Sequence, residues 1–299
     1  MRFLWFGRRR TADVRSPSPS RFAWLGSRRY DRAIPYALPQ DGDEISRLDF
    51  QHFLLRNAMR SNYLAPLTAP KDILDVGTGT GRWALEMAAR FPDANVVGTD
   101  VTASTTAEIG FGLTDIPRNY MFLPANVLER LPFADNSFDY VHMRLLFLAI
   151  PADRWQSVIN ELVRVTRPRG WVELLEASTF EQRGPAAERM LGWLLQVLGQ
   201  RNINIYIGKQ LGPMLQQAGL ANVQTQILDL PLGAHGGRLG KMVETDILTA
   251  TQGIKPLMIM SGAATAETFD REFTALQHEA ATLQMRYPFY AAYGQKLTG

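Results

Sequence analysis

The stretch ILDVGTGTGRWALEMA, residues 73–88, determines how the centre of this chain folds. Its β-branched and apolar first residues predict a buried strand with Asp75 near the carboxyl end, and the residues from Arg82 onward are good helix formers. The strand and the helix are joined by three glycines at alternate positions, Gly77, Gly79 and Gly81. Because glycine has no Cβ, this turn predicts a place where the backbone approaches a ligand closely.

The spacing of the glycines indicates which ligand this is. A dinucleotide-binding turn has the pattern GxGxxG or GxGxxA, whose last small residue lets helix and strand pack closely. Here the third glycine comes one residue earlier, and Arg82 follows it. The pattern DxGxGxG from Asp75 to Gly81 resembles motif I of the class I S-adenosylmethionine-dependent methyltransferases. That resemblance implies S-adenosylmethionine as the cofactor, with its amino-acid part beside Asp75, Gly77, Thr78, Gly79 and Gly81.

Two later strands end in side chains suited to the same cofactor. Residues 95–101 form a short apolar strand, and Asp100 near its end lies 19 residues after Gly81. At that separation an acid on the adjacent parallel strand reaches the ribose hydroxyls, and Val101 beside it is assigned to the cofactor as well. Residues 120–126 predict a third strand, and the resemblance implies contacts to adenine from Asn126 and Val127.

The following segments complete the fold class. Residues 138–144 predict a fourth strand and residues 170–176 a fifth, with an amphipathic helix between them. Strands that alternate with helices through short loops predict an α/β protein with a doubly wound, mostly parallel sheet. Ligands of such sheets lie at the carboxyl ends of the strands, where the strand order reverses. The predicted strand ends carry Asp75, Gly77, Asp100, Asn126 and His142.

Further motifs narrow the resemblance to the LaeA-like methyltransferases, which are linked with secondary metabolism in fungi and also have bacterial members. These motifs are GTGTGRWA at 77–84, FDYVHMR at 138–144, YPFYAAYGQK at 287–296, YALP at 36–39 and RLDFQH at 47–52. The chain departs from the relatives at Arg169, where they have a second glycine, and at Asn126, which is often an acid. The resemblance implies the seven-stranded sheet of the class I fold and methyl transfer to a small molecule, a specialised metabolite.

The chain divides into four parts on this interpretation. They are a basic arm at 1–35, a helical cap at 36–70, a cofactor-binding core at 71–180, and a helical insertion or lid with the last strands of the sheet at 181–299. We expect the cap to cover the cofactor; the alternative is a helix that only packs on the sheet edge. The apolar helices of the insertion either pack in the core or line a pocket for the molecule that accepts the methyl group. The candidates for contacts with the acceptor are His52, Trp193, Tyr206 and Met258.

The expected reaction is an in-line displacement at the methyl group of a sulfonium, which is already activated by its charge. The protein then supplies alignment and desolvation, plus a base if the acceptor carries a proton. His142, at the end of the fourth strand, is the candidate base; the alternative is a structural histidine that hydrogen-bonds the cofactor's amino-acid end. Arg144 is expected to pair with a carboxylate of the cofactor or substrate, or with Glu176.

Composition agrees with a cytoplasmic enzyme. The chain has 299 residues, 46% of them apolar, and no cysteine, so it forms neither disulfides nor thiolate zinc sites. Its four histidines lack the spacing of metal ligands, so no metal is expected. The longest apolar runs are too short to cross a bilayer.

The amino-terminal arm differs from the rest in charge. Residues 1–33 hold nine arginines against two acids. This charge would suit nucleic acid or a membrane surface, but we favour a mobile or partner-wrapping tail, through which the chain would form a homo-oligomer. Two other functions stay open. A methyltransferase acting on RNA or protein would suit the basic arm, although neither an NPPY-like tetrapeptide nor a recognition domain is found. A regulatory protein that binds the cofactor without catalysis would need no diagnostic residue.

Overall fold

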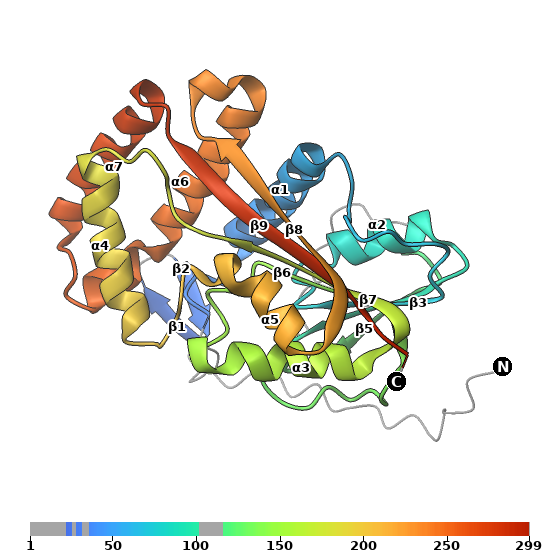
Figure 1. Ribbon diagram of the computed structural model, residues 1–299. Helices are drawn as coiled ribbons and strands as arrows, with labels where there is room; N and C mark the ends of the chain where they lie inside the picture. Colours follow the sequence, from blue (N-terminus) through green and yellow to red (C-terminus); the bar gives the residue numbers. More distant parts are fainter. Residues whose placement is uncertain (1–21, 26–27, 32–35, 102–115, 299) are drawn as a thin grey trace.

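A computed structural model describes residues 22–25, 28–31, 36–101 and 116–298 (Figure 1). The described residues contain a seven-stranded sheet in the order β5-β4-β3-β6-β7-β9-β8. All neighbouring strands are parallel except β9, which is antiparallel to both β7 and β8. The strands are β3 (Asp72–Val76), β4 (Asn95–Asp100), β5 (Tyr120–Pro124), β6 (Phe138–Arg144), β7 (Thr166–Ala177), β8 (Leu220–Pro231) and β9 (Arg286–Lys296). This confirms the predicted fold class.

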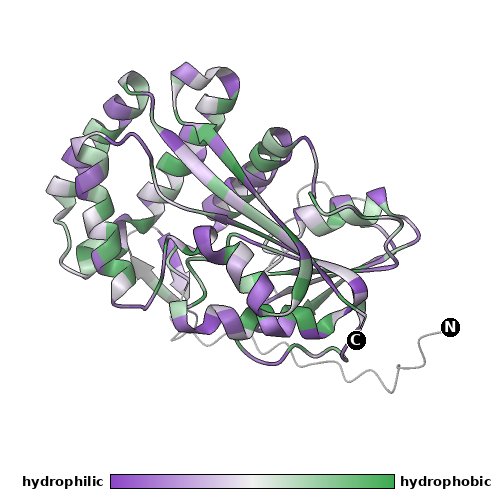
Figure 2. Cartoon of the chain, in the orientation of Figure 1, coloured by the Kyte–Doolittle hydropathy of each residue, from purple (hydrophilic) through white to green (hydrophobic). Residues whose placement is uncertain are grey.

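Helices cover both faces of the sheet, as a doubly wound fold requires. They are α1 (Gly42–Met59), α2 (Arg82–Arg90), α3 (Trp155–Val165), α4 (Pro185–Gly199), α5 (Leu211–Gln217), α6 (Gly237–Met260) and α7 (Ala266–Thr282), with short 3-10 turns at Ala152–Arg154, Ile207–Gln210 and Ala234–Gly236. Ile73 of β3 packs with α2 on one face, while Leu74 packs with α3 on the other. Hydrophilic and hydrophobic residues interchange along these helices (Figure 2), and the residues that α2 and α3 bury are all apolar.

The second half of the chain builds a separate helical layer at one end of the sheet. Helices α4, α6 and α7 lie together at the left of Figure 1, and α1 packs against α6. Buried apolar residues of these four helices form one cluster, which includes Leu54, Met190, Ile247 and Phe269. Helix α6 continues through Pro256 to Met260.

The end of the basic arm is folded where the structure describes it, which corrects the expectation of a mobile tail for that part. β1 (Phe22–Leu25) and β2 (Arg28–Asp31) form an antiparallel hairpin. Arg28 makes a bidentate ion pair with Asp41, which also caps α1 by accepting from the Glu44 N–H. The Tyr30 hydroxyl donates to the Gly253 carbonyl of α6. Residues 1–21, where the arm carries its other charges, lie outside the described part, as do residues 102–115.

Candidate active site

The motif I loop follows β3 and has the backbone that its glycines predicted. Gly77, Gly79 and Gly81 have φ angles of +67°, +55° and +75°, a region that glycine enters without strain. A Cβ on Gly77 would lie 2.6 Å from the Leu146 side chain, which would have to move to make room for it. A Cβ on Gly79 would meet nothing within 4 Å. Gly79 therefore faces open space, as expected for backbone that approaches a ligand.

The carboxylate of Asp75 fixes this loop through two hydrogen bonds. It accepts from the Thr78 hydroxyl at 2.7 Å and from His142 Nδ1 at 2.8 Å. The His142 ring stacks on Trp83 with ring centroids 3.9 Å apart, and His142 is only 2% exposed. The base role for His142 and the alternative of a hydrogen bond to the cofactor's amino-acid end both stay predictions; in the described structure His142 positions the loop through Asp75.

The ends of β4 and β5 lie next to the loop. The Asp100 carboxylate accepts from the Gly79 N–H at 3.0 Å, and Val101 beside it is exposed. Asn126 uses its side chain within its own turn, because Oδ1 accepts from the Leu128 N–H and Nδ2 donates to Glu129. The half-buried Val127 packs against the apolar cluster that contains Leu74 and the buried residues of α3.

Arg144 ends β6 beside the motif I loop. Its guanidinium donates to His52 Nδ1 of α1 at 2.9 Å, and His52 Nε2 lies 3.2 Å from Glu86. Desolvation by burial lowers the pKa of Arg144 and that of His52. The predicted pair with Glu176 is wrong, because the Glu176 carboxylate accepts from the Leu146 and Phe147 N–H groups instead. Among the described residues no carboxylate forms an ion pair with Arg144.

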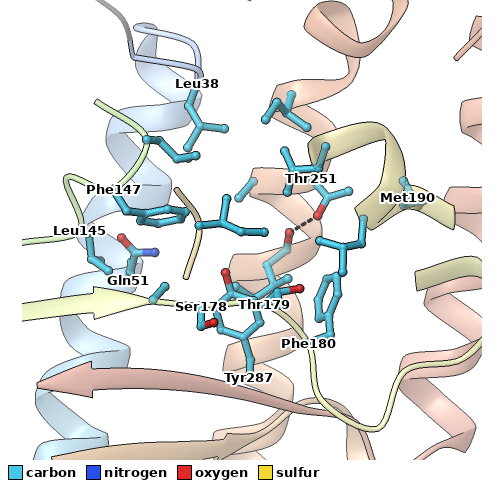
Figure 3. Close-up of a pocket in the computed structure, with 18 of the residues that line it drawn as sticks. Leu38, Gln51, Leu145, Phe147, Ser178, Thr179, Phe180, Met190, Thr251 and Tyr287 are labelled. Atoms are coloured by element: carbon cyan, nitrogen blue, oxygen red, sulfur yellow. Dashed lines mark hydrogen bonds between the residues drawn. The ribbon is translucent and has the colours of Figure 1, made fainter. Parts of the chain in front are cut away.

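An apolar pocket lies beyond the carboxyl ends of β6 and β7 (Figure 3). Its volume is about 130 Å³, and the loops after both strands, α1 and the helical layer enclose it. Its polar lining residues are Tyr36, Arg47, Gln51, Ser178, Thr179, Thr251 and Tyr287. Apolar residues around them include Leu145, Phe147, Phe180, Met190, Leu194 and Met258. This position, next to the strand that carries motif I, suits a molecule that reacts with a ligand on the loop.

Comparisons with known proteins agree with this site. The family model described as a methyltransferase domain matches residues 73–170. Methyltransferase str3 of Strobilurus tenacellus is 31% identical over 206 residues, which are 66% of this chain and 71% of the relative. The chain belongs to the class I S-adenosylmethionine-dependent methyltransferases.

Two further proteins extend the comparison. N-methyltransferase gliN of Aspergillus fumigatus is 26% identical over 277 residues. The alignment covers 87% of this methyltransferase and 96% of gliN. The solved YcgJ protein from Bacillus subtilis shares its fold with a TM-score of 0.52 at 19% identity, over 83% of this chain and all of that one (100%). The gliN alignment runs beyond the core on both sides, so the cap and the helical layer also have counterparts there.

The acceptor residues predicted for this methyltransferase do not line the pocket, except Met258. Trp193 packs half-buried against the apolar cluster, His52 lies on the buried side of α1, and Tyr206 borders a separate polar groove with Lys209. On α4 the residues facing the pocket are Met190, Leu191 and Leu194. Their i, i+1, i+4 spacing marks one helix face, and Trp193 lies off it.

The described residues of the methyltransferase contain neither a metal-binding group of side chains nor a helix that could span a membrane. No group of three or more histidine or acidic side chains there is arranged to hold a metal ion. None of its helices is both long and apolar enough to cross a bilayer.

Replacing Asp100 with alanine is expected to raise the dissociation constant for S-adenosylmethionine. The change removes the predicted charged acceptor for the ribose hydroxyls and the partner of the Gly79 N–H, which corresponds to about 1.5–3 kcal/mol. Calorimetry with S-adenosylhomocysteine measures the loss, and circular dichroism checks the fold. Asp93→Ala, at the exposed opposite end of β4, is the matched control and should bind normally. Protection against heat by NAD but not by S-adenosylmethionine would contradict the assignment.

Proposed function

We propose that this enzyme transfers the methyl group of S-adenosylmethionine to a largely apolar small molecule, a specialised metabolite. The pocket carries this proposal, because its apolar lining follows β6, the neighbour of the motif I strand β3, and includes residues of the surrounding helices. A chain segment of RNA or protein would need an open groove instead. The name of the N-methyltransferase relative supports nitrogen as the methylated atom. The motifs quoted above support a place in the LaeA-like subgroup.

The described residues fit the cofactor. Open space over Gly79 suits the amino-acid part, and the carboxylate of Asp100 and the exposed Val101 suit the nucleoside part. Arg144 is a buried cation that hydrogen-bonds only a neutral imidazole in the described chain, and it suits the carboxylate of the amino-acid part. S-adenosylmethionine supplies an activated methyl group when bound. Asn126 is the weakest of the assigned residues, because its own turn occupies its amide.

Helix α1 connects the two halves of the proposed site and would serve as their cover. Its Asp49 accepts from the Thr80 hydroxyl of the motif I loop at 2.6 Å and pairs with Arg82 at 3.0 Å. Its Arg47 pairs with Asp246 of α6 at 2.7 Å, in the layer that encloses the pocket. A methyl donor has to be shielded from water while the acceptor is admitted, and a helix bonded to both parts can do this.

Turnover with defined pools tests the function. We expect the purified chain to form S-adenosylhomocysteine with an extract of apolar metabolites, and to form none with RNA or with peptide pools. Turnover with RNA or peptides would favour a methyltransferase that acts on those polymers. Cofactor binding without turnover in any pool would favour a regulatory protein.

We also propose that the enzyme is cytoplasmic and that its amino-terminal arm joins copies of the chain. Sedimentation of the protein with and without residues 1–21 measures whether the arm is needed for this association.

A further inference from the structure

Gln51 is a polar side chain of α1 that enters the acceptor pocket beside Leu145 and Phe147 (Figure 3). Its Nε2 donates to the Asp246 carboxylate at 2.8 Å. The other oxygen of Asp246 accepts from Arg47 at 2.7 Å, and Arg47 is itself held by both oxygens of Glu44. Burial raises the pKa of Asp246, while Arg47 and Gln51 stabilise its ionised form.

This contact fixes the orientation of the Gln51 amide. An ionised carboxylate only accepts hydrogen bonds, so the amino group of Gln51 has to face Asp246 and its carbonyl oxygen has to point away from it. No described residue donates to that oxygen. Gln51 is half-buried and lines the pocket, so this oxygen can accept from a bound molecule with an N–H or O–H group. Oε1 of Gln51 is therefore available to accept a hydrogen bond from a molecule bound in the pocket.

The titratable groups of the pocket indicate which kind of group carries that hydrogen. In the described lining they are Tyr36, Arg47 and Tyr287. Burial raises the pKa of both tyrosines, and Arg47 is a cation held in two ion pairs. None of these groups takes up a proton at neutral pH. An alcohol has to lose a proton to become a strong nucleophile, whereas an uncharged amine already has its lone pair.

We propose that Gln51 is a positioning residue that accepts a hydrogen bond from an uncharged amine of the acceptor and so orients the nitrogen for methylation. This inference rests on the proposed function. The nitrogen lone pair forms the new N–C bond while the S–C bond of the donor breaks, and the electron pair of that bond stays on sulfur. The nitrogen keeps its hydrogen and becomes positively charged. Its proton passes to water when the product leaves, so no base of the protein takes part.

The test combines a variant with matched probes on the full chain. Indoline is an aromatic secondary amine that is uncharged at neutral pH, N-methylindoline is the same amine without the N–H, and indanol carries a hydroxyl group. We expect the wild type to methylate indoline and not indanol. Gln51→Leu should lower kcat/KM for indoline about tenfold, mainly through kcat. It should leave the slower methylation of N-methylindoline and the affinity for S-adenosylhomocysteine unchanged. Gln226→Leu, on the exposed side of β8, is the control.

The outcomes separate this inference from the function on which it rests. An equal loss for both amines in Gln51→Leu would show that Gln51 only maintains the structure, and would overturn the inference. Methylation of indanol by the wild type, or of none of the three probes by a protein that binds S-adenosylhomocysteine, would overturn the amine assignment and leave the donor site intact. A protein that binds no S-adenosylhomocysteine would instead contradict the proposed function.

Discussion

Gly79→Val is expected to abolish binding of S-adenosylmethionine and S-adenosylhomocysteine, with calorimetry as the measurement. The Gly79 N–H bonds the Asp100 carboxylate, and its missing side chain points where the protein has no atom within 4 Å. A valine there would place its methyl groups in the space assigned to the cofactor. The backbone has a φ of +55°, so the substitution also strains the fold by about 1–3 kcal/mol.

A matched variant separates this strain from the blocked site. Gly219 has a φ of +84° and likewise no protein atom within 4 Å of an added Cβ. It precedes β8 at the edge of the sheet opposite the motif I loop. Gly219→Val should lose a similar amount of thermal stability and still bind S-adenosylhomocysteine. If both variants bound as well as the wild type, the motif I loop would not be the cofactor site.

The sheet could be predicted because its signals are local. Ile73 and Leu74 lie in a continuous apolar run, as expected for a strand buried on both faces, and the glycines after it determine the turn. The alternation in β6 also held information about His142. Tyr140, His142 and Arg144 share one face of the strand, and the first two are almost completely buried. That face packs against Trp83 of α2, so an inward-facing imidazole could have been expected.

The acceptor side could not be predicted in the same way, because its contacts join distant parts of the chain. Gln51 meets Asp246, 195 residues later, and neither residue lies in a pattern that identifies the other. Pro256 is a residue that normally ends a helix, yet α6 continues past it because the helix packs against the cap and the layer. The face of α4 that meets the pocket depends on where α4 docks, so the sequence alone does not place Leu194 in the pocket and Trp193 outside it.

Arg144→Leu is expected to weaken binding of S-adenosylhomocysteine by about 3 kcal/mol, roughly a hundredfold. Burial of a guanidinium is unfavourable unless an anion or several acceptors compensate its charge. In the described chain Arg144 hydrogen-bonds only the His52 imidazole, and the carboxylates of Asp75 and Glu86 act on it without direct contact, although it ends the strand next to motif I. The carboxylate of the cofactor's amino-acid part is the anion that this position suits, and a leucine would leave that carboxylate unpaired.

A probe without the carboxylate makes this prediction specific. Methylthioadenosine keeps the nucleoside of S-adenosylhomocysteine and lacks its amino-acid part, so its affinity should be the same for Arg144→Leu and the wild type. Arg130→Leu removes an equal charge from a side chain that is 73% exposed, and it should change neither affinity. An equal loss for both nucleosides in Arg144→Leu would indicate general damage to the site. An undiminished affinity for S-adenosylhomocysteine would show that the carboxylate is bound elsewhere, and that Arg144 serves to hold α1 through His52.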